Sequence, residues 1–62
     1  MKRRKVIKLL KLAGFHIDTK RGKGSHAAIL DANGKIATGI SNNTVLTPGE
    51  LSRIQEATFL IF

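Results

Sequence analysis

The sequence predicts an α+β fold in the order α-β-β-β-α, a three-stranded antiparallel sheet with two helices on one face. Three observations support this fold class. Apolar residues recur at helical spacing near the N-terminus, the period changes to two from Phe15, and a complete helix start signal follows at Thr47. With 62 residues the chain has room for one small hydrophobic core, so we treat 1–62 as a single domain.

The first segment is expected to form an amphipathic helix. Val6, Leu10 and Ala13 recur at the spacing of one helical face, and the lysines between them point away from it. Gly14 stands where a left-handed residue ends many helices, which favours glycine. The cations at the start oppose the helix dipole, and a binding role would explain why they are tolerated.

Residues 15–40 have the pattern of a three-stranded meander. Apolar and polar residues alternate over 15–20, and two further strands are expected at 25–30 and 35–40. The step from Asn33 to glycine predicts the hairpin between the last two strands, because Asn-Gly accepts positive φ at both central positions.

The even length of this hairpin loop determines which side chains share a face of the sheet. The helix-covered face is expected to contain four apolar residues, Ala27, Ile29, Ile36 and Ile40. His16, Asp18 and His26 then lie together on the open face, beside the basic connection at 21–24.

The last helix has several start signals. Thr47 is the expected N-cap, Glu50 completes a capping box with it, and Leu46 with Leu51 fits a hydrophobic staple. We expect the helix to continue through the apolar end at 59–62. An extended edge that pairs with another chain is the alternative.

Charge is distributed unevenly along the chain. Residues 1–24 contain nine of the eleven Lys and Arg residues against one Asp, which leaves a net charge of +8 on this part. This asymmetry indicates a basic face for a polyanion. The absence of cysteine excludes a disulfide scaffold and thiolate metal sites, and no apolar run approaches the length of a membrane span. Without a compact set of ligands, we expect no metal or other cofactor.

His26 is the candidate catalytic residue. Histidine titrates near neutral pH, so an imidazole can remove the proton of an RNA 2′-hydroxyl or protonate the leaving 5′-oxygen. Lys20, Arg21 and Lys23 would bind phosphate beside it. His16 is expected to contact phosphate or to pair with Asp18. The chain has no Trp or Tyr, which favours recognition of backbone and shape over base stacking.

The chain resembles the HicA family of small toxins, the mRNA interferases of HicA–HicB toxin–antitoxin pairs. The matching features are segments 6–10 and 13–15, the run Lys23-Gly24-Ser25-His26, and the helix start at 46–54. The resemblance implies a fold similar to double-stranded-RNA-binding domains and cleavage of mRNA without metal. It also implies that His26 is catalytic, that Gly24 and Ser25 shape its approach, and that a HicB-type antitoxin holds the protein inactive.

The sequence therefore predicts a cytoplasmic endoribonuclease toxin with no membrane association. The alternative is a non-catalytic RNA-binding module that uses the same basic surface. A homodimer is a further expectation, through Phe59, Leu60, Ile61 and Phe62.

Overall fold

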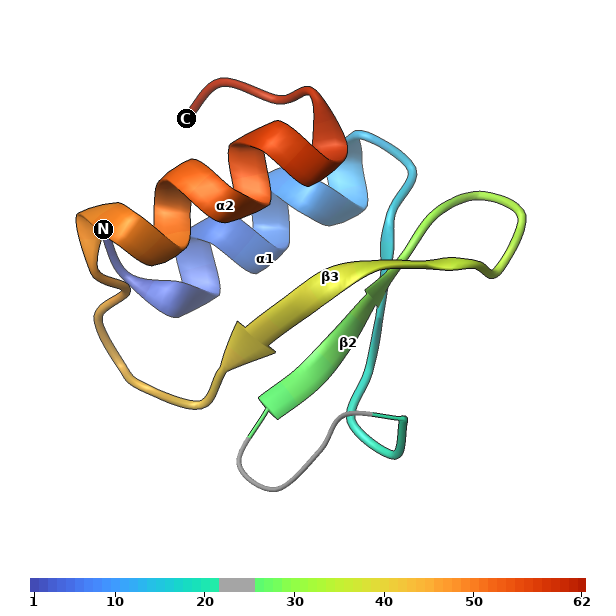
Figure 1. Ribbon diagram of the computed structural model, residues 1–62, viewed down its shortest axis with the longest axis horizontal. Coiled ribbons are helices and arrows are strands. Elements are labelled where there is room, and N and C mark those ends of the chain that lie inside the picture. Colours follow the sequence, from blue (N-terminus) through green and yellow to red (C-terminus); the bar gives the residue numbers. More distant parts are fainter. Residues whose placement is uncertain (22–25) are drawn as a thin grey trace.

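The computed structural model describes residues 1–21 and 26–62 and has the expected α-β-β-β-α order. The elements are α1 (Arg3–Leu12), β1 (His16–Asp18), β2 (His26–Leu30), β3 (Ile36–Ser41) and α2 (Pro48–Thr58). The strands form an antiparallel sheet in the order β1-β2-β3, and both helices lie on one face of it (Figure 1). Within the described residues, neither helix is long and apolar enough to cross a membrane.

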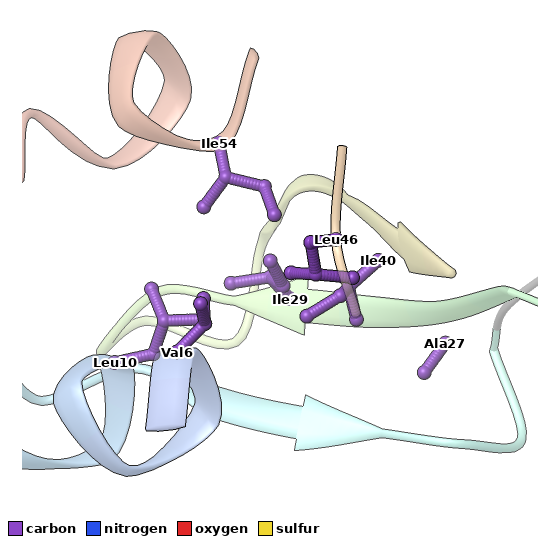
Figure 2. Packing of buried hydrophobic residues seen from close by; sticks show 7 residues of the cluster. All are labelled: Val6, Leu10, Ala27, Ile29, Ile40, Leu46 and Ile54. Atoms are coloured by element: carbon purple, nitrogen blue, oxygen red, sulfur yellow. The ribbon is translucent and has the colours of Figure 1, made fainter. Parts of the chain in front are cut away.

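A single apolar cluster lies between the helices and the sheet (Figure 2). Val6 and Leu10 lie one turn apart on α1 and are fully buried, as the helical spacing predicts. Ile54 is the fully buried residue that α2 contributes, and Ile29 and Ile40 come from the sheet. Burial of each large aliphatic side chain stabilises the fold by about 1.5–3 kcal/mol. The core therefore depends on a few residues, as expected for a domain of this size.

The end of α1 is a Schellman motif, in which the chain turns from helix to strand. Gly14 has a φ of 95°, and its N–H donates to the carbonyl of Lys11 at 3.1 Å. The N–H of Phe15 donates to the carbonyl of Leu10 at 2.9 Å, and both side chains belong to the core cluster. The prediction for Gly14 is confirmed, whereas Ala13 is exposed at the C-cap and adds nothing to the core.

The β2–β3 hairpin turns differently from the Asn-Gly prediction. Only Gly34 has a positive φ, 81°, and Asn33 does not. The Asp31 carboxylate oxygen Oδ1 accepts hydrogen bonds from the N–H groups of Asn33 at 2.8 Å and Lys35 at 3.0 Å. The carbonyl of Asp31 accepts a third hydrogen bond from the N–H of Gly34. The Asp31 side chain thus stabilises this turn, although Asp31 is not one of the two predicted central residues, Asn33 and Gly34.

The register of the hairpin shifts by one residue near the turn. Ile29 pairs with Thr38, whereas Leu30 pairs with Ile36, so Ala37 is an extra residue on β3. Ile36 therefore shares the open face with Leu30 and is 57% exposed. The prediction that Ile36 belongs to the core face is wrong. The extra residue, Ala37, shifts the inward and outward alternation of side chains by one position, so Ile36 points to the open face.

The start of α2 satisfies half of the predicted capping box. The Thr47 hydroxyl accepts a hydrogen bond from the N–H of Glu50 at 3.2 Å, and Leu46 is buried with Leu51 packed against the same core. The Glu50 carboxylate does not return to Thr47. It binds Ser41 instead, accepting from the N–H at 2.7 Å and from the hydroxyl at 2.9 Å.

The apolar C-terminal end is neither helix nor strand. Helix α2 ends at Thr58, and Phe59 takes a left-handed conformation with a φ of 60°. The chain then folds back, with the N–H of Phe62 donating to the Gln55 side-chain oxygen at 2.9 Å. Leu60 and Phe62 pack against the core. The prediction that the helix continues over 59–62 is therefore wrong. The left-handed Phe59 ends the helix, and the irregular segment after it places Leu60 and Phe62 against the core.

Candidate nucleic-acid interface

His26 is the first residue of β2 and is exposed on the open face of the sheet. Its position follows from strand alternation, because the next residue, Ala27, is buried in the core. Across the sheet, His26 is paired with Ser41 at the end of β3. The predicted face of His26 is therefore confirmed.

A surface hollow of about 420 Å³ lies beside this histidine. Its lining includes Arg21, His26, Ala28, Ile36, Gly39 and Arg53. Ala28 and Gly39 are cross-strand partners, and their small size leaves room above the sheet at this point. We call this feature the His26 hollow.

Arg21 is held over the open face by two contacts. Its Nε lies 3.6 Å from Oδ2 of Asp18, and its Nη1 donates to the carbonyl of Gly34 at 3.3 Å. The Arg21 side chain is nevertheless 56% exposed. A solvent-exposed ion pair of this kind is weak, so an incoming phosphate can compete with Asp18 for the guanidinium. The structure thus brings one predicted phosphate ligand to the same hollow as His26.

Asp18 is engaged on both carboxylate oxygens. Besides the contact with Arg21, its Oδ1 accepts a hydrogen bond from the N–H of Lys20 at 2.8 Å. Asp18 pairs with Ala28, so it is a diagonal neighbour of His26, with the Cα atoms about 7–8 Å apart. Among the described residues, nothing hydrogen-bonds the His26 imidazole. Asp18 thus orients Arg21 rather than the histidine.

The two histidines share a face but not a site. His16 pairs with Leu30, which lies four residues from His26 along β2, or about 13 Å along the strand. His16 is exposed and does not line the His26 hollow. The predicted open face is therefore confirmed for both residues, and their separation keeps His16 from exchanging a proton directly with a group at His26.

The other predicted RNA-binding residues belong to the β1–β2 connection. Lys20 is exposed in the turn after β1. Lys23, Gly24 and Ser25 lie outside the described residues. Of the predicted phosphate ligands, Arg21 is therefore the one that the described structure places in the His26 hollow.

Arg53 also lines this hollow, although the sequence analysis did not single it out. It lies on α2, one turn after Glu50, and its side chain is 56% exposed. An arginine on a helix with no recognisable motif around it gives no sequence signal that it belongs to a binding site. Its place beside His26 depends on how α2 docks against β3.

The basic N-terminal segment forms a second cluster at the end of β3. Lys2, Arg3 and Arg4, which we call the N-terminal basic cluster, line a hollow of about 460 Å³ with Asn42 and Thr44. The backbone of Met1 to Arg3 pairs with 44–46, which fixes this cluster in place.

Arg3 connects the N-terminal basic cluster to the strand opposite His26. Its Nε donates to the carbonyl of Ser41 at 2.7 Å, and Ser41 is the cross-strand partner of His26. The lysines at positions 5, 8 and 11 belong to α1 instead, and this helix lies in the layer on the other side of the sheet (Figure 1). The cations of residues 1–21, where the structure describes them, thus occupy separate parts of the surface rather than the single basic face that the sequence predicts.

Metal ligands do not gather in the described part of the chain, where no three His, Cys, Asp or Glu side chains form a group that could hold a metal ion. No family model, curated protein or solved structure matches the chain. Inferences about function therefore depend on the geometry of the site and on the sequence resemblance.

Proposed function

We propose that this chain is a metal-independent endoribonuclease that cleaves mRNA, with His26 as the general acid or base. The observation that carries the proposal is the exposed His26 in a hollow that also contains Arg21 and Arg53. An imidazole beside guanidinium groups supplies both proton transfer and charge stabilisation to a phosphodiester.

The reaction requires only side chains, the RNA and water. As a base, His26 takes the proton of the 2′-hydroxyl, and the 2′-oxygen attacks the adjacent phosphorus. The bond from phosphorus to the 5′-oxygen breaks, and this oxygen takes a proton from a water molecule as it leaves. The products are a 2′,3′-cyclic phosphate and a 5′-hydroxyl. Arg21 stabilises the additional negative charge on the phosphorane, and proton transfer of this kind contributes about 10²–10⁴-fold to the rate.

The resemblance to HicA toxins supports the same activity and adds a partner. The run Lys23-Gly24-Ser25-His26 carries the resemblance, because it places the histidine after a first helix and strand. We therefore propose that the chain is the toxin of a type II toxin–antitoxin pair and acts on cytoplasmic mRNA. A HicB-type antitoxin with an acidic surface would cover His26 and stabilise this small domain by mass action.

The decisive experiment is cleavage of a defined mRNA in EDTA by the wild type and by His26→Ala. We expect the wild type to cut and the variant to bind the RNA without cutting it. His16→Ala is the matched control, because it removes the same imidazole from the same face about 13 Å away along the sheet. Equal loss of cleavage in both variants would contradict the assignment of His26.

A non-catalytic RNA-binding module is the second candidate function. One observation favours it: in the described part of the His26 hollow, His26 is the sole side chain suited to proton transfer near neutral pH. Asp18 is engaged with Arg21 and Lys20, and His16 lies at the other end of the strand. If the wild type and His26→Ala bind RNA equally and neither cuts it, this module replaces the nuclease.

A further inference from the structure

One carboxylate connects the start of α2 to the sheet, in addition to the apolar contacts of the core. Glu50 lies in the first turn of α2, its side chain is 9% exposed, and both of its oxygens accept hydrogen bonds from Ser41. The N–H of Ser41 is thereby satisfied although β3 is the outermost strand. Glu50 thus fixes the start of α2 against the end of β3.

Arg53 projects from the next turn of this fixed helix. Its Nη2 lies 3.9 Å from Oε2 of Glu50, well beyond the 2.7–2.9 Å or so of a charge-assisted hydrogen bond. Among the described residues, Arg53 donates no hydrogen bond. Its guanidinium therefore keeps its donors available, in a fork that suits the oxygens of a phosphate.

The His26 hollow reaches Arg53 across β3. Thr38, whose partner Ile29 is a core residue, lines the hollow, and so do Ala28 and His26 on the open face. Gly39 follows Thr38 on β3 and also lines the hollow. Because glycine has no side chain, nothing at this position separates the core-facing side of β3 from its open face. The hollow therefore extends around the free edge of β3 towards α2.

Two guanidinium groups from different elements thus line one hollow. Arg21 follows β1, Arg53 belongs to α2, and each side chain is 56% exposed. Apart from His26, the remaining lining is small or apolar, with Ala28, Gly39 and the exposed Ile36. A flexible chain with several phosphates matches this surface better than a single small anion does, because successive phosphates can engage both cations along the hollow.

We infer that Arg53 binds a backbone phosphate of single-stranded RNA, and that the strand runs around the edge of β3 from Arg21 to Arg53. This inference rests on the proposed function, because it specifies the path of the RNA that His26 is proposed to cut. It assigns to the first part of α2 a role in holding substrate.

Binding of a single-stranded RNA with 2′-O-methyl groups tests this inference, because such a strand cannot be cleaved through its 2′-oxygens. We expect Arg53→Gln to weaken binding about tenfold, which corresponds to about 1.4 kcal/mol. The slope of log K against log salt should fall by about 0.7, the value for one phosphate contact on a single strand. Arg53→Lys should retain the slope and recover part of the affinity, because it keeps the charge and loses the fork.

Lys11→Gln is the matched control, because it removes the same charge from an exposed position on α1, away from the hollow. It should leave affinity and salt slope unchanged. Wild-type affinity and slope in Arg53→Gln would overturn the inference, and so would an equal loss in Lys11→Gln. Thermal unfolding of each variant shows whether the exposed substitutions leave the fold intact.

Cleavage kinetics separate this inference from the proposed function. If both hold, Arg53→Gln raises KM with little change in kcat, whereas His26→Ala removes kcat. If the wild type does not cut RNA but Arg53→Gln weakens binding, the nuclease is excluded and the Arg53 inference stands. If the wild type cuts and Arg53→Gln leaves KM and binding unaltered, the Arg53 inference is wrong and the nuclease stands.

Discussion

Glu50→Gln is expected to destabilise the fold substantially, although the substitution is nearly isosteric. The carboxylate accepts from both the N–H and the hydroxyl of Ser41, a residue that is 7% exposed. Glutamine keeps one oxygen for the N–H, and its NH₂ group pairs with the hydroxyl only if the hydroxyl rotates to accept, so both hydrogen bonds lose their charged acceptor. A hydrogen bond to a charged group contributes about 1.5–3 kcal/mol, and we expect a loss of this size.

Urea unfolding followed by circular dichroism measures this loss. The midpoint should fall with an unchanged m-value, because the surface exposed on unfolding stays the same. For a domain of this size, each 1 kcal/mol lowers Tm by about 4–8 °C, so the change is easily measured.

Glu56→Gln is the matched control for Glu50→Gln, because Glu56 is exposed on the same helix and makes no ion pair or hydrogen bond with a described residue. Its effect should stay within about 0.5 kcal/mol. If both substitutions lower the free energy of unfolding equally, the loss in Glu50→Gln does not come from the hydrogen bonds to Ser41, and the reasoning is refuted. A double-mutant cycle with Ser41→Ala should give a coupling energy of at least about 0.5 kcal/mol.

Two further substitutions test other parts of the fold. Gly34→Ala should cost about 1 kcal/mol in urea unfolding because Gly34 has a φ of 81°, whereas Gly49→Ala, equally free of neighbours but without positive φ, should cost less. Replacing Phe59 and Ile61 together by serine should leave Tm nearly unchanged, because these side chains are 93% and 94% exposed. If the chain forms a dimer through this end, size-exclusion chromatography should show the serine variant as a monomer and the wild type as a dimer. Coelution of both as monomers would exclude that dimer.

The features that sequence predicted correctly are local ones. The left-handed conformation of Gly14 depends on the helix that precedes it, and the hydroxyl of Thr47 needs only an N–H three residues later. His26 was placed on the open face by the parity of the hairpin loop, and this prediction holds because Ala27 still pairs with Ile40 on the core face, beyond the bulge.

The features that sequence did not predict depend on partners distant in the chain or on side chains in turns. The Asp31 carboxylate bonds two N–H groups of its hairpin, and the bulge beside this turn places Ile36 on the open face. Glu50 bonds Ser41, nine residues earlier, instead of closing the capping box. Arg53 lies beside the His26 hollow because the contact of Glu50 with Ser41 helps to position α2. The position of Arg53 within the helix sequence therefore does not predict that it lines the hollow.

The end of β3 connects the fold to the candidate site. Ser41 accepts a hydrogen bond from Arg3 at its carbonyl, donates two to Glu50, and pairs across the sheet with His26. The N-terminal basic cluster and the first turn of α2 are therefore fixed to the same strand end as the candidate catalytic residue. Of the cations in the N-terminal basic cluster and α2, Arg53 lines the His26 hollow, whereas Arg3 is connected to it only through the carbonyl of Ser41. Because Glu50 holds α2 and not the imidazole, its loss should disturb the RNA binding that we propose for Arg53 before it disturbs the proton transfer that we propose for His26.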